Sequence, residues 1–312
     1  MEHSALRNKG EAMGAHELIT GDLRLRISTK GGVILGLWWG GTAGEVPLLR
    51  PAISDDADAA ASGCYPLVPF GNRVAGNRFS FGGNDYTLKP NTDWDEHYLH
   101  GDGWQGEWTV ANLAADAITL TFEHRGGHTP YEYRAEQVVS LTENQLEMKL
   151  SVENCGERAM LFGLGWHPFF PLTPRTTLLA PAGFFRTEAD GWLPGERAPM
   201  PADLDFSSPS PLPHRWVNNG LEDWSGEALI SWPERHTALA IKADRLFRHA
   251  FVFVSDTSFD PDFKRDYFCF EPMSHLANGH NLPGLGDLQI LKPGENLSGS
   301  IRLQPQNLGI FR

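Results

Sequence analysis

The chain has 312 residues, of which 41% are hydrophobic and 21% are charged, a composition typical of a globular protein with a large core. Its formal net charge of −13 argues against binding to nucleic acid or to an anionic membrane surface, because both depend on clustered lysine and arginine. The beginning of the sequence has no apolar signal region, no run reaches about 18 apolar residues, and the cysteines form no CxxC pair, so we expect a cytoplasmic protein.

Residues 1–16 show no regular pattern, and we expect a flexible extension there, followed by a single domain over residues 17–312. Helical periodicity is hard to find over any window of 11 residues. Glycine, proline and asparagine turns instead separate short apolar or alternating runs, which predict an all-β fold, a large antiparallel β-sandwich with few short helices. The strands are expected within 22–29, 31–41, 77–88, 117–125, 137–155, 160–170, 228–233, 238–244, 250–256, 266–272 and 297–305.

The proline-rich segment 174–214 is the longest irregular stretch. It suits a linker between two domains, or a set of loops and short strands over one end of a single sandwich. We favour the second interpretation because strand-like runs resume after it.

Glu271 ends the apolar run DYFCFEP, and this position is unusual for a carboxylate. Strand alternation places Tyr267, Cys269 and Glu271 on one face and Phe268 and Phe270 on the other. An exposed carboxylate at a strand end is the ordinary interpretation, since glutamate is rarely buried without a partner. The alternative is a partly dry pocket that raises the pKa of Glu271 and suits it to act as a general base.

Four stretches combine polar side chains with glycine, proline or aromatic neighbours: GNRVAG (71–76), YLHGDGWQGEW (98–108), GLGWHPFF (163–170) and FCFEPMSH (268–275). Each has a structural explanation on its own, for example a surface Arg73 or a core His167. Together they offer an arginine, two histidines and a glutamate, a set able to hold a polyol and move protons across it. No HExxH or Cys/His spacing indicates a metal site, and neither a phosphate-binding loop nor a GxSxG nucleophile elbow is present.

In this order and at roughly this spacing, the four stretches resemble the aldose 1-epimerases (mutarotases), in particular a bacterial branch of that family. NRVAGNRFSFGGNDYTL is similar to the family's Asn-Arg and the hairpin after it, LHG at 99–101 to its Leu-His-Gly, and EPMSH to its Glu-Pro-Met-Thr-His form. The resemblance covers residues 17–305 and extends to the closing LKPGENLSGSIRL. It implies a galactose mutarotase-like supersandwich that interconverts the α and β anomers of a free aldose without a metal or cofactor.

The resemblance also implies a role for each matching residue. Glu271 is the expected general base on the anomeric hydroxyl, and His167 the general acid to the ring oxygen. This division of roles needs burial to raise the pKa of the glutamate while the histidine keeps its proton near neutral pH. His100 is expected beside the ring oxygen, and Arg73 and Asn72 are expected to bind sugar hydroxyls.

The family's hydroxyl-binding aspartate has two candidate positions in WVNNGLEDWSGEALISWP (216–233). Alignment on an aspartate before an aromatic residue selects Asp223, and alignment on the later Trp-Pro segment selects Asn218. We favour Asp223 slightly. An asparagine would keep an acceptor but lose the charge.

Two alternatives remain open at this point. A hexose-6-phosphate 1-epimerase on the same fold would need extra cations near the site, for which Arg78, Lys89, Arg245 and Arg248 are candidates. A non-catalytic carbohydrate-binding protein would more naturally lack the glutamate or the histidine. The sequence indicates a small sugar as partner and leaves open whether the protein is a monomer or a homodimer.

Overall fold

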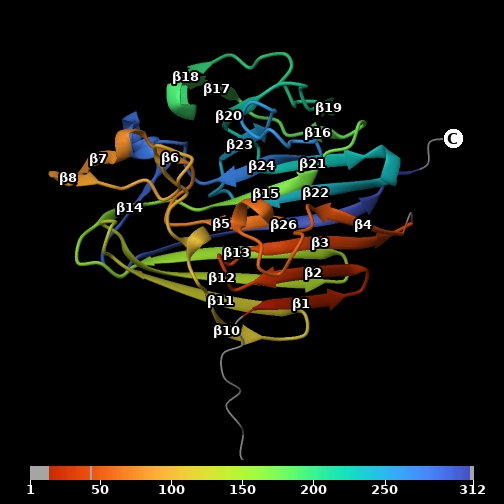
Figure 1. The fold of residues 1–312 in the computed structure, drawn as a ribbon, viewed down its shortest axis with the longest axis horizontal. Coiled ribbons are helices and arrows are strands. Elements are labelled where there is room, and N and C mark those ends of the chain that lie inside the picture. The colour runs from red at the N-terminus through yellow and green to blue at the C-terminus, as the bar shows by residue number, and fades with distance from the viewer. Residues whose placement is uncertain (1–13, 43, 310–312) are drawn as a thin grey trace, which may run out of the picture.

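The computed structural model describes residues 14–42 and 44–309, and two large antiparallel sheets dominate it (Figure 1). One sheet has eleven strands. In spatial order they are β1 (Ala15–Thr20), β2 (Leu23–Ser28), β3 (Ile34–Gly41), β5 (Cys64–Leu67), β15 (Gly165–Pro171), β24 (Tyr267–Met273), β23 (His249–Val254), β20 (Val217–Glu222), β17 (Phe184–Ala189) and β18 (Leu193–Ala198), with β4 (Gly44–Leu49) paired to β3.

The second sheet has nine strands, in the order β10 (Thr109–Leu113), β11 (Ala117–Arg125), β12 (Glu132–Thr142), β13 (Gln145–Asn154), β26 (Asn296–Asn307), β22 (Thr237–Ala243), β21 (Glu227–Trp232), β16 (Thr177–Leu179) and β19 (Ser210–Pro211). Three two-stranded ribbons complete the described strands: β6 (Arg73–Val74) with β9 (Tyr98–Leu99), β7 (Arg78–Phe81) with β8 (Asn84–Thr87), and β14 (Met160–Phe162) with β25 (Gln289–Leu291). The helices within the described residues are short 3₁₀ turns at Ala59–Ala61, Ala75–Asn77, Gly103–Gln105, Asp190–Trp192, Pro233–Arg235, Gly279–Asn281 and Pro283–Asp287. The predicted all-β antiparallel fold is confirmed.

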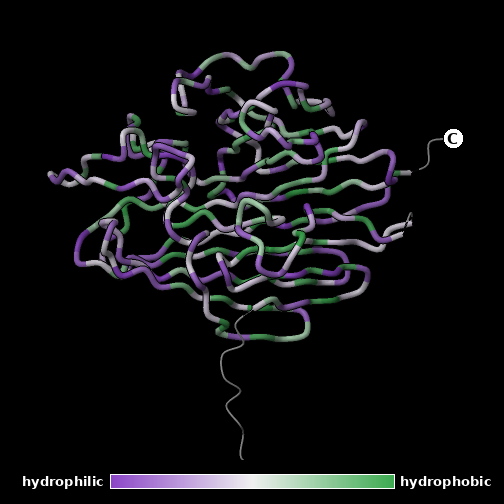
Figure 2. The backbone as a smooth tube through the Cα atoms, viewed as in Figure 1, coloured by the Kyte–Doolittle hydropathy of each residue, from purple (hydrophilic) through white to green (hydrophobic). Residues whose placement is uncertain are grey.

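Alternating side chains explain why these segments form a sandwich. Along β12 the buried Tyr133, Ala135, Val139 and Leu141 alternate with more exposed neighbours, so one face of the strand enters the core. Apolar residues from both sheets form one continuous core cluster. Figure 2 shows the hydrophobic residues mainly along the strands through the middle of the molecule.

Turn chemistry also agrees with the sequence. Gly82 and Gly83 connect β7 to β8 as a two-residue turn with φ of +60° and +77°, values that glycine adopts without strain. Segment 174–214 runs as short strands: β17 and β18 extend the eleven-stranded sheet, whereas β16 and β19 extend the nine-stranded sheet. Strand β1 begins at Ala15, inside the extension expected at 1–16, and residues 1–13 of that extension lie outside the described residues.

Strand β24 has the two faces that its sequence predicts. Phe268 and Phe270 belong to the core between the sheets. Cys269 and Tyr267 belong to a second apolar cluster on the opposite face of the eleven-stranded sheet, and Glu271 lines a cavity on that face. The site therefore lies on the outer face of the eleven-stranded sheet.

Among the described residues, none of the helices has the length and apolar character that crossing a bilayer requires.

Candidate active site

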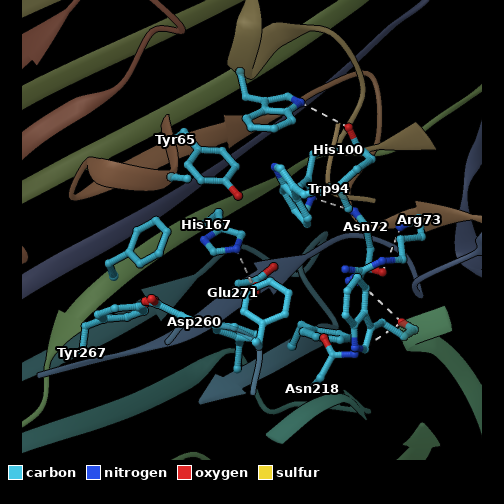
Figure 3. A pocket seen from close by; sticks show the side chains of 18 of the residues that line it. Tyr65, Asn72, Arg73, Trp94, His100, His167, Asn218, Asp260, Tyr267 and Glu271 are labelled. Carbon is cyan, nitrogen blue, oxygen red and sulfur yellow. Dashed lines mark hydrogen bonds and ion pairs between the residues drawn. The ribbon is translucent and has the colours of Figure 1, made fainter. Parts of the chain in front are cut away.

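His167 and Glu271 face each other from the neighbouring strands β15 and β24. The register that pairs Gly165 with Met273 and Phe169 with Cys269 places position 167 opposite position 271. The two side chains lie on the same face, and His167 Nε2 is 3.3 Å from Glu271 Oε1 (Figure 3). Glu271 is only 2% exposed and His167 only 8% exposed. The strand-end glutamate is thus buried beside a histidine.

A cavity of about 490 Å³ opens over this pair, within the range of roughly 300–1,000 Å³ that is usual for ligand sites. Five adjacent strands, β5, β15, β24, β23 and β20, each supply at least one residue to its lining. The lining residues on these strands are Tyr65, His167, Phe169, Tyr267, Glu271, Phe251, Phe253 and Asn218. The floor of the site is therefore rigid sheet.

Aromatic rings fix the position of the His167 imidazole. Tyr65, its partner in the β5–β15 register, stacks on it with a centroid distance of 4.4 Å and an interplanar angle of 15°. Phe169 packs beside it at 4.8 Å, and His100 meets it edge-on at 5.3 Å. The ring therefore presents Nε2 to Glu271 in a single orientation.

Burial shifts the pKa values of the pair in opposite directions. It raises the pKa of Glu271 well above its ordinary value, against a smaller opposing effect of the Arg73 charge. It lowers the pKa of His167 to about 3. The raised pKa of Glu271 agrees with our expectation. The lowered pKa of His167 does not, because we expected this histidine to keep its proton near neutral pH. The cause is that the low-dielectric floor disfavours both charged forms, which favours a neutral carboxyl group beside a neutral imidazole.

Two buried atoms of the pair have no hydrogen-bond partner among the described residues. They are Glu271 Oε2 and His167 Nδ1. Buried polar atoms are normally bonded, and each exception needs an explanation. Glu271 belongs to the cavity lining, so its unpartnered Oε2 is part of a carboxyl group beside the space that a ligand could occupy.

The Asn-Arg and Leu-His-Gly motifs meet beside the pair. Arg73 of β6 pairs with Leu99 of β9, and this short ribbon aligns Asn72 with His100. The His100 N–H donates to the Asn72 carbonyl at 3.0 Å, and the Asn72 N–H donates to His100 Nδ1 at 2.9 Å. Both residues have positive φ, +62° for Asn72 and +60° for His100, a conformation that costs energy and is concentrated at functional sites.

The hydrogen bond from Asn72 settles the tautomer of His100. Because Nδ1 accepts the backbone N–H, the ring proton resides on Nε2. Burial lowers the pKa of His100 well below its ordinary value, and the nearby His167 adds to the effect. His100 is therefore a neutral hydrogen-bond donor to the cavity.

Arg73 is oriented by bonds that use part of its guanidinium group. Its Nε donates to the buried Asp95 at 2.7 Å, and Nη1 donates to the Trp192 carbonyl at 3.4 Å. The guanidinium also lies 5.3 Å from the centroid of the Trp192 ring. This arrangement leaves Nη2 without a hydrogen-bond partner among the described residues, while Asp95 balances the charge.

The structure brings Asn218, and not Asp223, to the cavity. Asn218 Nδ2 donates to Glu188 at 2.6 Å and to the Trp192 carbonyl at 3.3 Å, so its Oδ1 is left to accept from a ligand hydroxyl. Asp223 follows β20 on the surface, where it pairs with Arg197 and Arg248 at 3.3 and 3.2 Å. Asp223 lies beyond the end of β20 and has a φ of +53°, so the chain leaves the strand there and carries this side chain away from the cavity.

Sequence reasoning missed several residues that line or support the cavity: Tyr65, Asp95, Glu188, Trp192 and Asp260. Most lie in loops or in segment 174–214, where no periodicity marks them. Tyr65 lies in a four-residue strand whose every position is buried, so alternation gave no signal.

The candidate phosphate-binding cations Arg78, Lys89, Arg245 and Arg248 are all absent from the cavity lining. Within the described ranges, no three histidine, cysteine, aspartate or glutamate side chains gather as metal ligands.

Comparison with known proteins agrees with this fold and identifies the family. The family model for aldose 1-epimerase matches residues 15–304. The chain belongs to the aldose 1-epimerase family, as its motifs suggested.

Individual relatives support the same assignment. The uncharacterised Escherichia coli K12 protein YphB is 45% identical over 293 residues, which cover 94% of this chain and 99% of YphB. A crystal structure of an aldose 1-epimerase-like protein from E. coli K12 is 43% identical, with a TM-score of 0.90, 96% of this chain covered and 100% of that chain. A galactose mutarotase-like protein from Clostridium acetobutylicum, at 18% identity and a TM-score of 0.80, shows the same fold over 94% of this chain and 95% of its own.

Proposed function

We propose that this protein is an aldose 1-epimerase that interconverts the α and β anomers of an uncharged aldose. The observation that carries the proposal is the buried Glu271–His167 pair, 3.3 Å apart on the floor of a cavity that also presents hydroxyl-binding groups. Opening a pyranose requires a base at O1 and an acid at O5. Glu271 and His167 lie close enough together to act on these two neighbouring oxygens of one sugar ring.

In the proposed reaction, each ring opening and closure moves one proton at O1 and one at O5 and breaks or forms the C1–O5 bond. The Glu271 carboxylate takes the proton of the O1 hydroxyl while protonated His167 gives its proton to O5, and the C1–O5 bond breaks to leave an open-chain aldehyde. Rotation about C1–C2 presents the other carbonyl face. On closure O5 attacks C1, His167 takes the proton back from O5, and Glu271 returns a proton to O1. The pair holds one proton throughout.

The free site holds this proton on Glu271, so the cyclic sugar reacts after the proton crosses to His167. The 3.3 Å contact provides the path. A bound sugar favours the transfer, because its hydroxyls donate to the carboxylate and replace the hydration that burial removed. Neutral His100 donates from Nε2 near the ring-oxygen side, whereas Arg73 and Asn218 hold the remaining hydroxyls.

The charges around the cavity favour a neutral sugar over a phosphorylated one. Arg73, the one Lys or Arg among the lining residues that the structure describes, is already paired with Asp95. Glu271 and Asp260 add carboxyl groups to the lining. A phosphate dianion would meet no free cation there.

Polarimetry on freshly dissolved α-D-glucose and α-D-galactose in low-phosphate buffer tests this function. The proposal predicts a faster approach to anomeric equilibrium with at least one neutral aldose, and no competition by inorganic phosphate. Activity confined to phosphorylated sugars would contradict the choice of substrate, and no activity with any aldose would contradict the function.

A further inference from the structure

His275 is a buried histidine that takes no part in the proposed proton transfers. It ends the stretch FCFEPMSH, four residues after Glu271, and is only 1% exposed. It is not among the residues that line the cavity. The backbone of Gly163 approaches it so closely that a Cβ at that position would lie 2.2 Å from His275 Nδ1, so only glycine leaves room for the ring. The chain thus packs a polar ring tightly behind the site.

The imidazole of His275 joins three of the four polar stretches by hydrogen bonds. The Gly71 N–H donates to His275 Nε2 at 2.9 Å. Because Nε2 accepts, the ring proton resides on Nδ1, and Ser274 Oγ accepts it at 3.2 Å. Ser274 in turn bonds to Leu164 twice: its Oγ accepts from the Leu164 N–H at 2.8 Å, and its N–H donates to the Leu164 carbonyl at 2.9 Å. The stretches that begin GNR, GLG and FCF therefore meet at this ring.

The loop 71–75, called the binding loop because its Asn72 lines the cavity, depends on two histidine acceptors. The successive N–H groups of Gly71 and Asn72 donate to His275 Nε2 and His100 Nδ1, both at 2.9 Å. Asn72 has a φ of +62°, a conformation that persists only where the surroundings over-determine it. Burial lowers the pKa of His275 to about 3, so its ring stays neutral and able to accept. Two neutral imidazoles together fix this strained backbone.

The chain that follows this histidine adds further bonds to the binding loop. The Asn278 N–H donates to the Arg73 carbonyl at 3.1 Å, and Asn278 Oδ1 accepts from the Ala75 N–H at 3.0 Å. The next turn, Gly279–Asn281, lies beside β6 and β7 (Figure 1). The segment after β24 therefore supports the binding loop along its length, and β24 is the strand that carries the proposed base.

On the basis of the proposed function, we propose that His275 is a positioning residue for sugar binding. It acts through the Gly71 N–H, which sets the backbone of Asn72 and, through Asn72, the tautomer and orientation of His100. Because Glu271 precedes His275 by four residues on the same segment, the bond to Gly71 also fixes the position of the base relative to the hydroxyl-binding groups. His275 itself touches no substrate atom.

Two substitutions of His275 separate its bond to Gly71 from its bond to Ser274. The side-chain amide of His275→Asn ends near the place of Nδ1, so it keeps a donor for Ser274 but is too short to accept from the Gly71 N–H. The amide of His275→Gln reaches the place of Nε2 and offers an oxygen to that N–H. In polarimetric assays with α-D-galactose, His275→Asn should raise KM about tenfold, the worth of one hydrogen bond, and change kcat less than about threefold, whereas His275→Gln should keep KM within about threefold of the wild type.

An unchanged KM in His275→Asn, or an equal rise in both variants, would overturn the proposal. A loss of kcat at constant KM would overturn it too, because the effect would then act through Glu271. His280→Asn is the matched control: His280 is 5% exposed, burial lowers its pKa to about 3, and its Nε2 lies 2.8 Å from the Tyr131 hydroxyl and not at the binding loop. This variant should lose stability and leave KM unchanged.

NMR of the histidine ring nitrogens keeps the test independent of the proposed function, because it needs neither sugar nor turnover. In the wild type, the nitrogen shifts should show His275 protonated on Nδ1 and His100 protonated on Nε2. His275→Asn should shift the Nδ1 signal of His100 as Asn72 moves, whereas His280→Asn should leave that signal in place. These results would support the positioning role even if no aldose reacts. An Nε2-protonated His275 in the wild type, or an unchanged His100 signal in His275→Asn, would overturn it even in an active epimerase.

Discussion

Replacing Glu271 with glutamine should stabilise the protein at neutral pH, and the stabilisation should grow with pH. Glu271 is 2% exposed, and burial raises its pKa well above the ordinary value of 4.5. Folding therefore opposes ionisation of this group. Its folded pKa lies above its unfolded pKa, so the stability it contributes is complete below about pH 4.5 and is lost as pH rises toward the folded pKa. Glutamine has the same shape and does not titrate.

The size of the effect follows from the pKa difference. Each pKa unit corresponds to about 1.4 kcal/mol of unfolding free energy. If Glu271 stays protonated throughout the interval from pH 4.5 to pH 7, the cost to the wild type at pH 7 reaches its limit of about 3 kcal/mol. At roughly 2 °C per kcal/mol for a chain of this length, the melting temperature of Glu271→Gln should exceed that of the wild type by up to about 6 °C.

Thermal melts of both proteins from pH 4 to pH 8 measure this difference. The two curves should approach each other near pH 4 and separate above it. Glu222→Gln is the matched control: Glu222 is also buried, at 8% exposure, but it pairs with Arg186 at 2.6 Å, so its loss should lower the melting temperature. Parallel curves for wild type and Glu271→Gln at all pH values would refute the argument that the carboxyl group occupies a dry site.

Three further substitutions, with Asp223→Ala as a control outside the cavity, test individual contacts of the site. His167→Asn should lower kcat by about 10²–10⁴-fold in anomerisation assays, the usual contribution of one positioned acid or base, and near-full activity would indicate a purely structural histidine. Asp95→Asn should raise KM more than it lowers kcat, because Arg73 loses its orienting partner but stays outside the proton transfers; a selective loss of kcat would contradict this. Asn218→Leu should raise KM by about tenfold, the worth of one hydrogen bond to a hydroxyl, whereas Asp223→Ala should leave KM unchanged; the reverse result would place Asp223 at the site.

Strand alternation was the most informative signal in the sequence. It predicted an all-β sandwich, and it assigned Phe268 and Phe270 to one face of β24 and Glu271 to the other, as the structure confirms. The four polar stretches also pointed to one cavity, although the sequence could not show how they meet. The β6–β9 ribbon, which brings Asn72 next to His100, has only two residues in each strand. Strands this short show no alternation of polar and apolar residues in the sequence.

The parts that the sequence could not provide depend on tertiary contacts. Asn218 reaches the cavity because β20 pairs with β23, a partner more than 30 positions away in the chain. Trp192 lies in a 3₁₀ turn of the irregular segment 174–214, yet its carbonyl accepts from both Arg73 and Asn218. The pKa values of the pair also depend on tertiary contacts: burial lowers the pKa of His167 and raises that of Glu271, and the sequence could not show how deeply the two groups are buried.

The measurement that tests the central claim most directly is the rate of anomeric equilibration of a neutral aldose by wild type and by Glu271→Gln, at equal concentration and with folding of the variant verified by its melting temperature. The account predicts catalysis by the wild type and a loss of about 10²–10⁴-fold in the variant, because glutamine keeps the shape of the site and cannot take the O1 proton. Full activity of a folded Glu271→Gln would contradict the assignment of Glu271 as the base.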